Sequence, residues 1–132
     1  MTQNETLLLG IDIGTTGTKC AIYDLKGELV AHAYQEYSMI HPQPSWAEQD
    51  PHRWWNAVQT NLRDCFEQQG IDSSRIASIG LSCTNAMTLV DEAGEPVYNA
   101  IVWQCRRTAE LCEDLKRRGL EERIRAATGL LI

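Results

Sequence analysis

The clearest chemistry in this sequence lies in an acidic residue followed by a turn of small and hydroxylated residues. Asp12 ends an apolar run, and residues 14–19 read Gly-Thr-Thr-Gly-Thr-Lys. Glycines let a backbone approach phosphate oxygens closely, and threonine hydroxyls can donate hydrogen bonds to them. A carboxylate about 4 Å from a phosphate costs about 4 kcal/mol at an intermediate dielectric. A divalent cation such as Mg²⁺ removes that repulsion, so we predict Asp12 as a metal ligand beside a phosphate-binding turn.

The phosphate contacts are expected to come from the turn and from the start of the strand that follows it. The spacing matches neither GxxxxGK[ST] nor GxGxxG, which argues against a P-loop or a Rossmann fingerprint. An ordinary hairpin with a threonine-rich turn, in which Asp12 is only a turn carboxylate, is the alternative interpretation. The predicted nucleotide-binding residues are Gly14, Thr15, Thr16, Gly17, Thr18 and Lys19, the last as a point charge.

Three strands are predicted to position this turn. Leu7–Ile13 is apolar at nearly every position, which is typical of a central strand. Thr18–Asp24 should pair with it across the Gly14–Gly17 turn. A second turn at Lys26 and Gly27 should then lead into a third strand, Glu28–Tyr37. The chain is therefore expected to open with three antiparallel strands.

A long helix is predicted after an irregular stretch at residues 40–50, where two prolines interrupt regular structure. Asp50 is a good N-cap, Pro51 suits the first helical position, and Gly70 suits the end. The helix should bury one apolar face. The residues expected on that face are Trp54, Trp55, Val58, Leu62, Cys65 and Phe66.

The second half of the sequence predicts shorter elements. Arg75–Ser82 should return as a buried strand, and Leu89–Val90 and Tyr98–Trp103 should form two short strands around an Asp91–Pro96 turn. Two helices are expected to follow, at residues 107–117 and 120–127, with glycines at 119 and 129 as stops. The apolar ending at residues 130–132 indicates the opening portion of a longer protein or a cut chain.

Composition excludes several classes of function. The 132 residues suit one domain, and a net charge of −6 with no basic stripe argues against a nucleic-acid partner. No apolar run reaches the roughly 18–20 residues of a membrane span, and the N-terminus does not resemble a signal peptide. The five cysteines lack CxxC or CxxH spacing, which disfavours zinc and disulfides. We expect a cytoplasmic protein with free thiols and no membrane partner.

Four segments in order resemble one family. Gly10–Lys19 resembles the first phosphate motif of the FGGY carbohydrate kinases, which belong to the superfamily of actin, Hsp70 and hexokinase ATPases. Ser45–Pro51, with the tryptophan pair that follows it, is similar to the family pattern GWxExDPxxWW. Ile79–Ser82 is similar to the IGxS strand, and Ala100–Thr108 is close to the corresponding stretch of glycerol kinases. The resemblance covers essentially the whole chain.

This resemblance implies a fold and an activity. The implied fold is an α/β, ribonuclease H-like domain with a mixed sheet, opened by three antiparallel strands and flanked by helices. The implied activity is ATP-dependent phosphorylation of a sugar or polyol hydroxyl, with Mg²⁺. Residues 1–132 would be the N-terminal kinase domain, incomplete, from a two-domain protein that forms a homodimer or a higher oligomer. The family's catalytic base is expected downstream, so we assign no catalytic residue to this chain.

The substrate side is expected around an aromatic residue and one loop. The resemblance implies that Trp103 lines the acceptor pocket, where its ring can pack on the carbon face of a sugar; a core tryptophan is the alternative. The loop that follows the Ile79–Ser82 strand is expected to complete that pocket. The predicted substrate-binding residues are Thr84, Asn85, Ala86, Met87 and Trp103.

The loop residues disagree about the acceptor. Glycerol kinases carry Arg and Glu where Asn85 and Ala86 stand, and alanine cannot accept a hydroxyl hydrogen bond. The pair Ala86–Met87 looks like gluconate kinases, and a nearby methionine also occurs in xylulokinases. Cys105 stands where pentulose kinases carry Asp. Arg106 and Arg107 are candidates for an anionic substrate group, although arginines at a helix start are usually solvated.

Two hypotheses from other classes stay open. The hairpin alone is compatible with a non-catalytic ATP-binding module of the actin and Hsp70 superfamily. A bare folding domain from a truncated reading frame is also compatible with the ending of the sequence.

Overall fold

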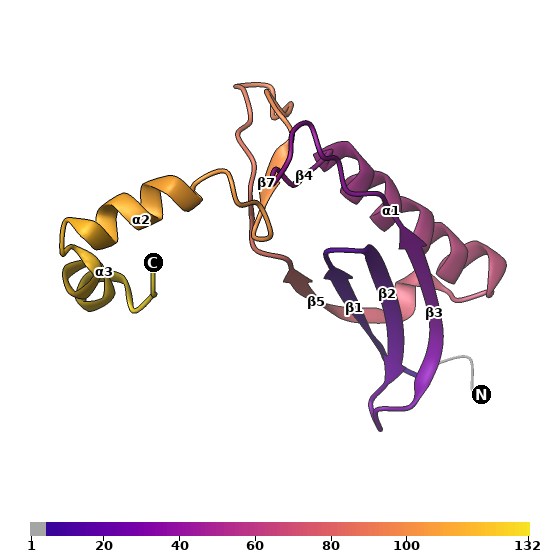
Figure 1. Ribbon diagram of the computed structural model, residues 1–132. Coiled ribbons are helices and arrows are strands. Elements are labelled where there is room, and N and C mark those ends of the chain that lie inside the picture. The colour runs from indigo at the N-terminus through magenta and orange to yellow at the C-terminus, as the bar shows by residue number, and fades with distance from the viewer. Residues whose placement is uncertain (1–4) are drawn as a thin grey trace.

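A four-stranded mixed sheet carries the predicted phosphate turn (Figure 1). The computed structural model describes residues 5–132. Strands β1 (Leu7–Ile13), β2 (Gly17–Asp24) and β3 (Leu29–Glu36) are antiparallel neighbours, and β5 (Ile76–Cys83) lies parallel to β1. The order is β3-β2-β1-β5. The predicted opening of three antiparallel strands in a mixed sheet is therefore confirmed.

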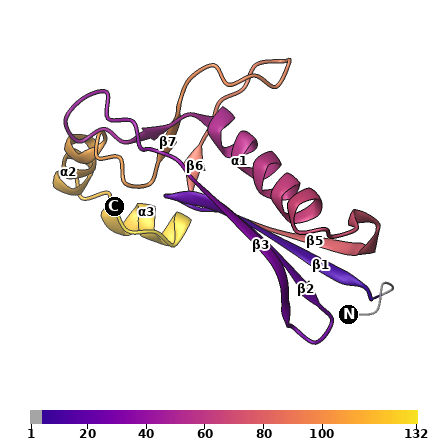
Figure 2. The ribbon, with the colours of Figure 1, turned by 90° about the vertical axis from the view of Figure 1, so that its right-hand side faces the viewer.

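One face of this sheet is covered by a helix (Figure 2). Helix α1 (Pro51–Arg63) begins as predicted, because the Asp50 carboxylate accepts a hydrogen bond of 3.0 Å from the backbone N–H of His52. The helix continues as a π-helical turn at Asp64–Gln68, and Gly70 follows it with φ +68°. The predicted start and stop signals are both correct.

The core lies between α1 and alternate residues of the first three strands. Trp55, which was expected on this face, is 62% exposed, because it stands about 100° around the helix from Trp54. Val58 is buried as expected, and Ala57 and Asn61 are buried on the helix in addition. The buried apolar cluster consists of Leu7, Leu9, Ile11, Cys20, Ile22, Ala31, Ala33, Val58 and Cys65.

The strand β5 differs from its prediction in burial. Its position is correct to within one residue, but seven of its eight residues are exposed, and Ile79 is 63% exposed. In the sheet formed by residues 5–132, β5 is the edge strand next to β1. The apolar sequence correctly predicted a strand. The predicted burial was wrong for residues 5–132, because burial of a strand requires elements packed on both of its faces.

A second, small sheet joins distant segments. Its strands are β4 (Glu48–Gln49), β7 (Ala100–Val102) and β6 (Ala86–Met87), in the order β4-β7-β6. The stretch at 40–50 thus contains a short strand where only irregular structure was expected. Strand β7 pairs with β4 and β6 and not with Leu89–Val90, since Val90 forms only a single bridge, to Pro96.

Two exposed helices end the chain on the side of the small sheet away from α1 (Figure 1). Helix α2 (Ala109–Arg117) and helix α3 (Glu121–Thr128) are each followed by a glycine with positive φ, at 119 and 129, as predicted. All residues of both helices are described, and none is buried. Their ion pairs connect residues three or four apart near or within one helix. No helix in residues 5–132 is long and apolar enough to cross a membrane.

Candidate active site

The turn between β1 and β2 is closed by its own backbone. The N–H of Gly14 donates to the carbonyl oxygen of Gly17 at 2.9 Å. A Cβ atom at position 17 would lie 2.5 Å from the carbonyl oxygen of Gln35 and 2.6 Å from the ring of Tyr34. Glycine is required at position 17 because β3 passes so close, and this contact fixes where the turn can lie.

Buried and half-buried polar side chains support the backbone of the turn. The hydroxyl of Tyr37 donates to the carbonyl oxygen of Gly14, and the Thr18 hydroxyl donates to Tyr37 at 3.4 Å. The amide of Asn61, on α1, donates to the carbonyl oxygen of Thr18 at 2.8 Å. Burial raises the pKa of Tyr37, so its hydroxyl remains a neutral donor.

The position of Thr18 corrects one predicted nucleotide contact. Its side chain is fully buried, and its hydroxyl is used in the bond to Tyr37. It therefore faces the core rather than a phosphate, because alternate residues of a strand point to opposite faces. Thr16 and Lys19 are exposed, and Thr15 is half-buried, so these three remain available as predicted phosphate contacts.

A glutamine that the sequence did not single out holds the tip of the turn. Gln49 is buried, and its side-chain N–H donates to the carbonyl oxygen of Thr15 at 2.6 Å. Its side-chain oxygen accepts a bond of 3.1 Å from the indole N–H of Trp54. The polar Gln49 within a tryptophan-rich segment was the available signal, but only the fold shows which carbonyl it meets.

Asp12 stands on the sheet face opposite α1. It is exposed at the end of β1, across from Lys19 on β2 and Ser82 on β5. This face forms a hollow of about 410 Å³. The hollow is lined by Gly10, Ile11, Asp12, Lys19, Ala21, Tyr23, Gly80, Leu81 and Ser82.

The surroundings of Asp12 fit a magnesium ion that is bound together with a nucleotide. Among the described residues, no three His, Cys, Asp or Glu side chains gather in a metal-binding group. Mg²⁺ commonly keeps several waters and takes one or two carboxylates, with phosphate oxygens as further ligands. A single exposed carboxylate beside the turn suits that form of binding, and it does not suit a metal held by protein side chains alone.

A second hollow, of about 560 Å³, collects the predicted acceptor residues. Four of the five predicted substrate-binding residues line it, and Trp103 among them is 66% exposed, which rules out a core role for it in the described structure. Thr84 is the exception: it does not line this hollow, and its backbone N–H donates to the carbonyl oxygen of Ile13 at 2.7 Å. The hollow is lined by Asn85, Ala86, Met87, Ile101, Val102, Trp103, Cys105, Arg107 and Thr108.

The turn and the second hollow adjoin. The indole N–H of Trp103 donates to the hydroxyl oxygen of Thr15 at 3.3 Å. The hydroxyl of Thr84 lies 3.3 Å from the same oxygen. A side chain of the predicted acceptor pocket thus reaches a side chain of the predicted phosphate turn.

Arg107 does not behave as expected for an arginine before a helix. Arg106 is exposed, but the Arg107 side chain is only 16% exposed and forms an ion pair with Glu48. Its Nε–H donates to the sulfur of Cys105 at 2.9 Å, and its guanidinium lies 3.9 Å from the ring centre of Trp46. Sequence reasoning missed this contact because Glu48 is 59 residues away.

Glu48 is fully buried at the centre of a polar network. Besides Arg107, its carboxylate accepts hydrogen bonds from the Tyr98 hydroxyl at 3.1 Å and from the Asn99 amide at 3.0 Å. Burial alone raises the pKa of Glu48, but the bonds from Asn99, Arg107 and Tyr98 outweigh it and lower the pKa below its usual value. Glu48 is therefore an anion at neutral pH.

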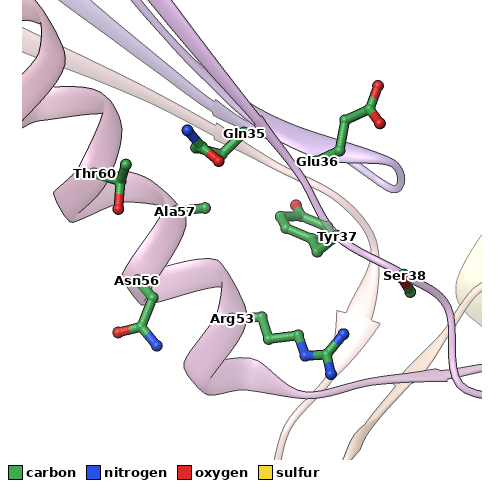
Figure 3. A pocket seen from close by; sticks show the side chains of 8 residues that line it. All are labelled: Gln35, Glu36, Tyr37, Ser38, Arg53, Asn56, Ala57 and Thr60. Atoms are coloured by element: carbon green, nitrogen blue, oxygen red, sulfur yellow. The ribbon is translucent and has the colours of Figure 1, made fainter.

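A third hollow, of about 290 Å³, lies between the end of β3 and α1 (Figure 3). Tyr37 and Arg53 line it, and Glu36 and Arg53 point in different directions there. None of the predicted site residues is among its lining residues. We therefore place the candidate site at the first two hollows.

The mixed sheet and its covering helix define an α/β domain of the actin and hexokinase kind. The description "FGGY family of carbohydrate kinases, N-terminal domain" belongs to a family model that matches residues 7–132. The chain is therefore a member of the FGGY family of carbohydrate kinases, and the expected family and fold are confirmed.

Individual relatives agree with this assignment. A glycerol kinase of Vibrio parahaemolyticus is 43% identical over 100% of this chain and 26% of its own length. The crystal structure of a gluconate kinase from Lactobacillus acidophilus has a TM-score of 0.83 and 30% identity, covering 92% of this chain and 24% of that one. A xylulose kinase from Rhodospirillum rubrum has a TM-score of 0.82 and 27% identity, over 91% and 25%. The chain spans about a quarter of the length of these relatives.

Proposed function

We propose that this chain supplies the phosphate turn and one wall of the acceptor pocket of an ATP-dependent carbohydrate kinase. The reaction would move the γ-phosphoryl group of ATP to a hydroxyl of a sugar or polyol. One observation carries the proposal: the hydrogen bond from Trp103 to Thr15 joins the hollow that would hold the acceptor to the turn that would hold the phosphates. Phosphoryl transfer needs that proximity of donor and acceptor.

The phosphate side would be held by the turn and by the exposed residues around it. The tip of the turn can approach phosphate oxygens closely. The Lys19 ammonium is exposed and can meet them, as can the exposed Thr16 hydroxyl, which lies 3.3 Å from the Tyr34 hydroxyl. Asp12 would hold Mg²⁺, which neutralises phosphate charge when bound. The partly buried hydrogen bonds from Tyr37 to Gly14 and from Gln49 to Thr15 would keep this backbone in place during the reaction.

The acceptor side would be built from one flat ring and a small loop. The exposed face of Trp103 can pack against the carbon atoms of a polyol. The Asn85 amide can donate to or accept from a hydroxyl, whereas Ala86 and Met87 offer shape only. The wall thus accepts a hydroxylated chain through packing and few directional bonds.

The base that removes the hydroxyl proton is not assigned to any residue of this chain. We therefore expect the 132-residue polypeptide by itself to transfer no phosphoryl group and to bind ATP weakly. Incubating it with ATP, Mg²⁺ and a panel of sugars, and measuring ADP formation, tests this expectation. Measurable sugar-dependent turnover by the isolated chain would contradict it.

The decisive variant of the full-length protein is Asp12→Asn. It removes the charge that would hold Mg²⁺ and keeps the size of the side chain, so we expect the rate to fall by about a hundredfold or more. Sugar-dependent ADP formation measures it. Asp24→Asn is the matched control, since Asp24 caps the next turn through bonds to the N–H groups of Lys26 and Glu28. An undiminished rate for Asp12→Asn would remove the proposed mechanism. ATP hydrolysis independent of sugar would favour an ATP-binding module of the actin and Hsp70 superfamily that phosphorylates no sugar.

The proposal also includes the cellular compartment and the oligomeric state of the full-length protein. All five cysteines are unpaired, with Cys20 and Cys65 buried, which supports a reducing cytoplasm. Burial raises the pKa of Cys20 to about 11, so that thiol is unreactive. The homodimer or higher oligomer stays a prediction, and sedimentation of the full-length protein measures it.

A further inference from the structure

Strand β3 contributes a tyrosine to the open face of the sheet, beside the predicted phosphate turn. Tyr34 is the register partner of Lys19, and Lys19 is the register partner of Asp12. Directly paired residues of neighbouring antiparallel strands lie on the same face of a sheet, so these three residues form one row across β3, β2 and β1. All three are exposed. The row thus places a residue that the sequence analysis did not single out next to the predicted phosphate cation and metal ligand.

Gly17 makes room for the ring of this tyrosine. A Cβ atom at position 17 would lie 2.6 Å from both Cζ and Oη of Tyr34, so a side chain there would displace the hydroxyl end of the ring. With glycine at position 17, the ring lies against the start of β2. The Tyr34 hydroxyl oxygen is then 3.3 Å from Oγ1 of Thr16.

The backbone of Thr16 is held by the same segment of chain. The N–H of Tyr37, just after β3, donates to the carbonyl oxygen of Thr16 at 3.2 Å. The segment that contains Tyr34 and Tyr37 therefore fixes the backbone of Thr16 and also contacts its hydroxyl.

The two hydroxyl groups differ in acidity, and this difference gives their hydrogen bond a direction. A phenol is more acidic than an aliphatic alcohol, which makes it the stronger donor. Each hydroxyl has one proton to donate, so when Tyr34 donates to Thr16, the proton of Thr16 is left for another acceptor. Donation to a hydroxyl oxygen also polarises the O–H group of the acceptor and strengthens the bond that this group donates in turn.

We propose that Tyr34 is a positioning residue for the phosphates of ATP: its hydroxyl donates to Oγ1 of Thr16, and the Thr16 hydroxyl donates to a phosphate oxygen. This inference rests on the proposed kinase function and adds a residue of β3 to its phosphate side. A donor that is already oriented loses less freedom when the ligand binds than a donor that rotates freely. Charged phosphate oxygens form stronger bonds with such a donor than neutral oxygens do.

The variant Tyr34→Phe of the full-length protein tests the role of the hydroxyl, because it keeps the ring against Gly17. We expect the KM for ATP, and the Kd for ATP with Mg²⁺ measured by calorimetry without acceptor, to rise about three- to tenfold, as for the loss of one hydrogen bond. The KM for the acceptor and the Tm should stay near their wild-type values, since the hydroxyl pair is exposed. His32→Gln is the matched control, because His32 is exposed on the same face of β3, two residues further from the turn.

Variants of Thr16 show whether Tyr34 acts through it. Thr16→Val should raise the Kd for ATP at least as much as Tyr34→Phe does, whereas Thr16→Ser keeps the hydroxyl and should bind ATP nearly as tightly as the wild type. The double variant Tyr34→Phe/Thr16→Val should bind ATP no more weakly than Thr16→Val alone, because the two hydroxyls form one chain of hydrogen bonds.

The outcomes separate this inference from the kinase function. An unchanged Kd for Tyr34→Phe or for Thr16→Val, or effects that add in full in the double variant, overturns the role of Tyr34 and leaves the kinase function intact. A Tyr34→Phe protein that circular dichroism shows to be unfolded also overturns this role, since the hydroxyl would then support the fold. A protein that shows the expected changes in Kd but phosphorylates no sugar or polyol contradicts the kinase function alone, and a protein that binds no ATP contradicts both.

Discussion

The two halves of the candidate site are built differently. The tip of the β1–β2 turn is held by three side chains, Tyr37, Gln49 and Asn61, each of which donates to a backbone carbonyl. The acceptor wall rests on strands of two and three residues, β6 and β7, and its largest side chain, Trp103, is exposed. The β1–β2 turn is held in place by the core, whereas the acceptor wall lies at the edge of the core.

This difference corresponds to what each half would bind. The phosphates of ATP are the same for every acceptor, so a rigid backbone supported by buried groups suits them. The acceptor varies between relatives, and exposed residues on short strands can change without disturbing the core. Substitutions at the turn should therefore lower stability and turnover together, and substitutions in the wall should change acceptor binding alone.

The largest effect is expected from Gly17→Ala. The new Cβ would lie within 3.0 Å of a backbone oxygen and of a ring, so β2 and β3 must move apart, at a cost of about 1–3 kcal/mol. We expect a lower Tm and a loss of turnover of about a hundredfold or more, since the turn moves with β2. Gly10→Ala is the control for Tm, because its Cβ would have only an ordinary contact at 3.8 Å. Equal Tm values for the two variants would contradict the close approach at Gly17.

A smaller effect is expected from Gln49→Ala. It removes the bond to the Thr15 carbonyl and leaves the Trp54 indole N–H without its partner. We expect kcat to fall by about ten- to a hundredfold, with a Tm lower by a few degrees. Steady-state kinetics and thermal unfolding measure the two. Gln69→Ala removes a similar hydrogen bond, to the carbonyl oxygen of His32, far from the turn. If this variant lowers kcat equally, the bond from Gln49 to Thr15 has no specific role in turnover.

The smallest effect on stability is expected from Trp103→Ala. We expect the KM for the acceptor to rise about tenfold, because the packing face is lost, while Tm and the KM for ATP stay near their wild-type values. Trp55→Ala provides the comparison, since that tryptophan is also exposed but lies on α1. A large fall in Tm for Trp103→Ala would show that the wall supports the fold after all, and that the contrast between the halves is wrong.

Local patterns predicted most of the fold correctly. The apolar run of β1, the turn glycines, the cap at Asp50 and the glycine stops at 70, 119 and 129 each act within a few residues of their own position. The sequence alone therefore locates the strands, the helices and the turn that carries the candidate site.

Most of the errors concern contacts between distant residues, whereas the exposure of Trp55 follows from its own position on α1. The burial of β5 depends on what covers it, and the bonds from Gln49 to Thr15 and from Arg107 to Glu48 span 34 and 59 residues. Thr18 has the right chemistry for a phosphate contact, but the alternation of β2 turns it toward Tyr37. Residue type and spacing identify candidate site residues. The packed fold determines which of these residues can reach a ligand and which support the site.

The exposed C-terminal helices have a consequence for solution conditions. Lys116, Arg117, Arg118 and Arg125 each pair with an acidic neighbour through water-exposed side chains, and nothing on α2 or α3 is buried. Mobile ions screen such pairs, with a Debye length of about 10 Å at 0.1 M salt and about 3 Å at 1 M. A high salt concentration therefore weakens the ion pairs of α2 and α3 first. The four-stranded sheet is stabilised by apolar burial and is less affected by salt.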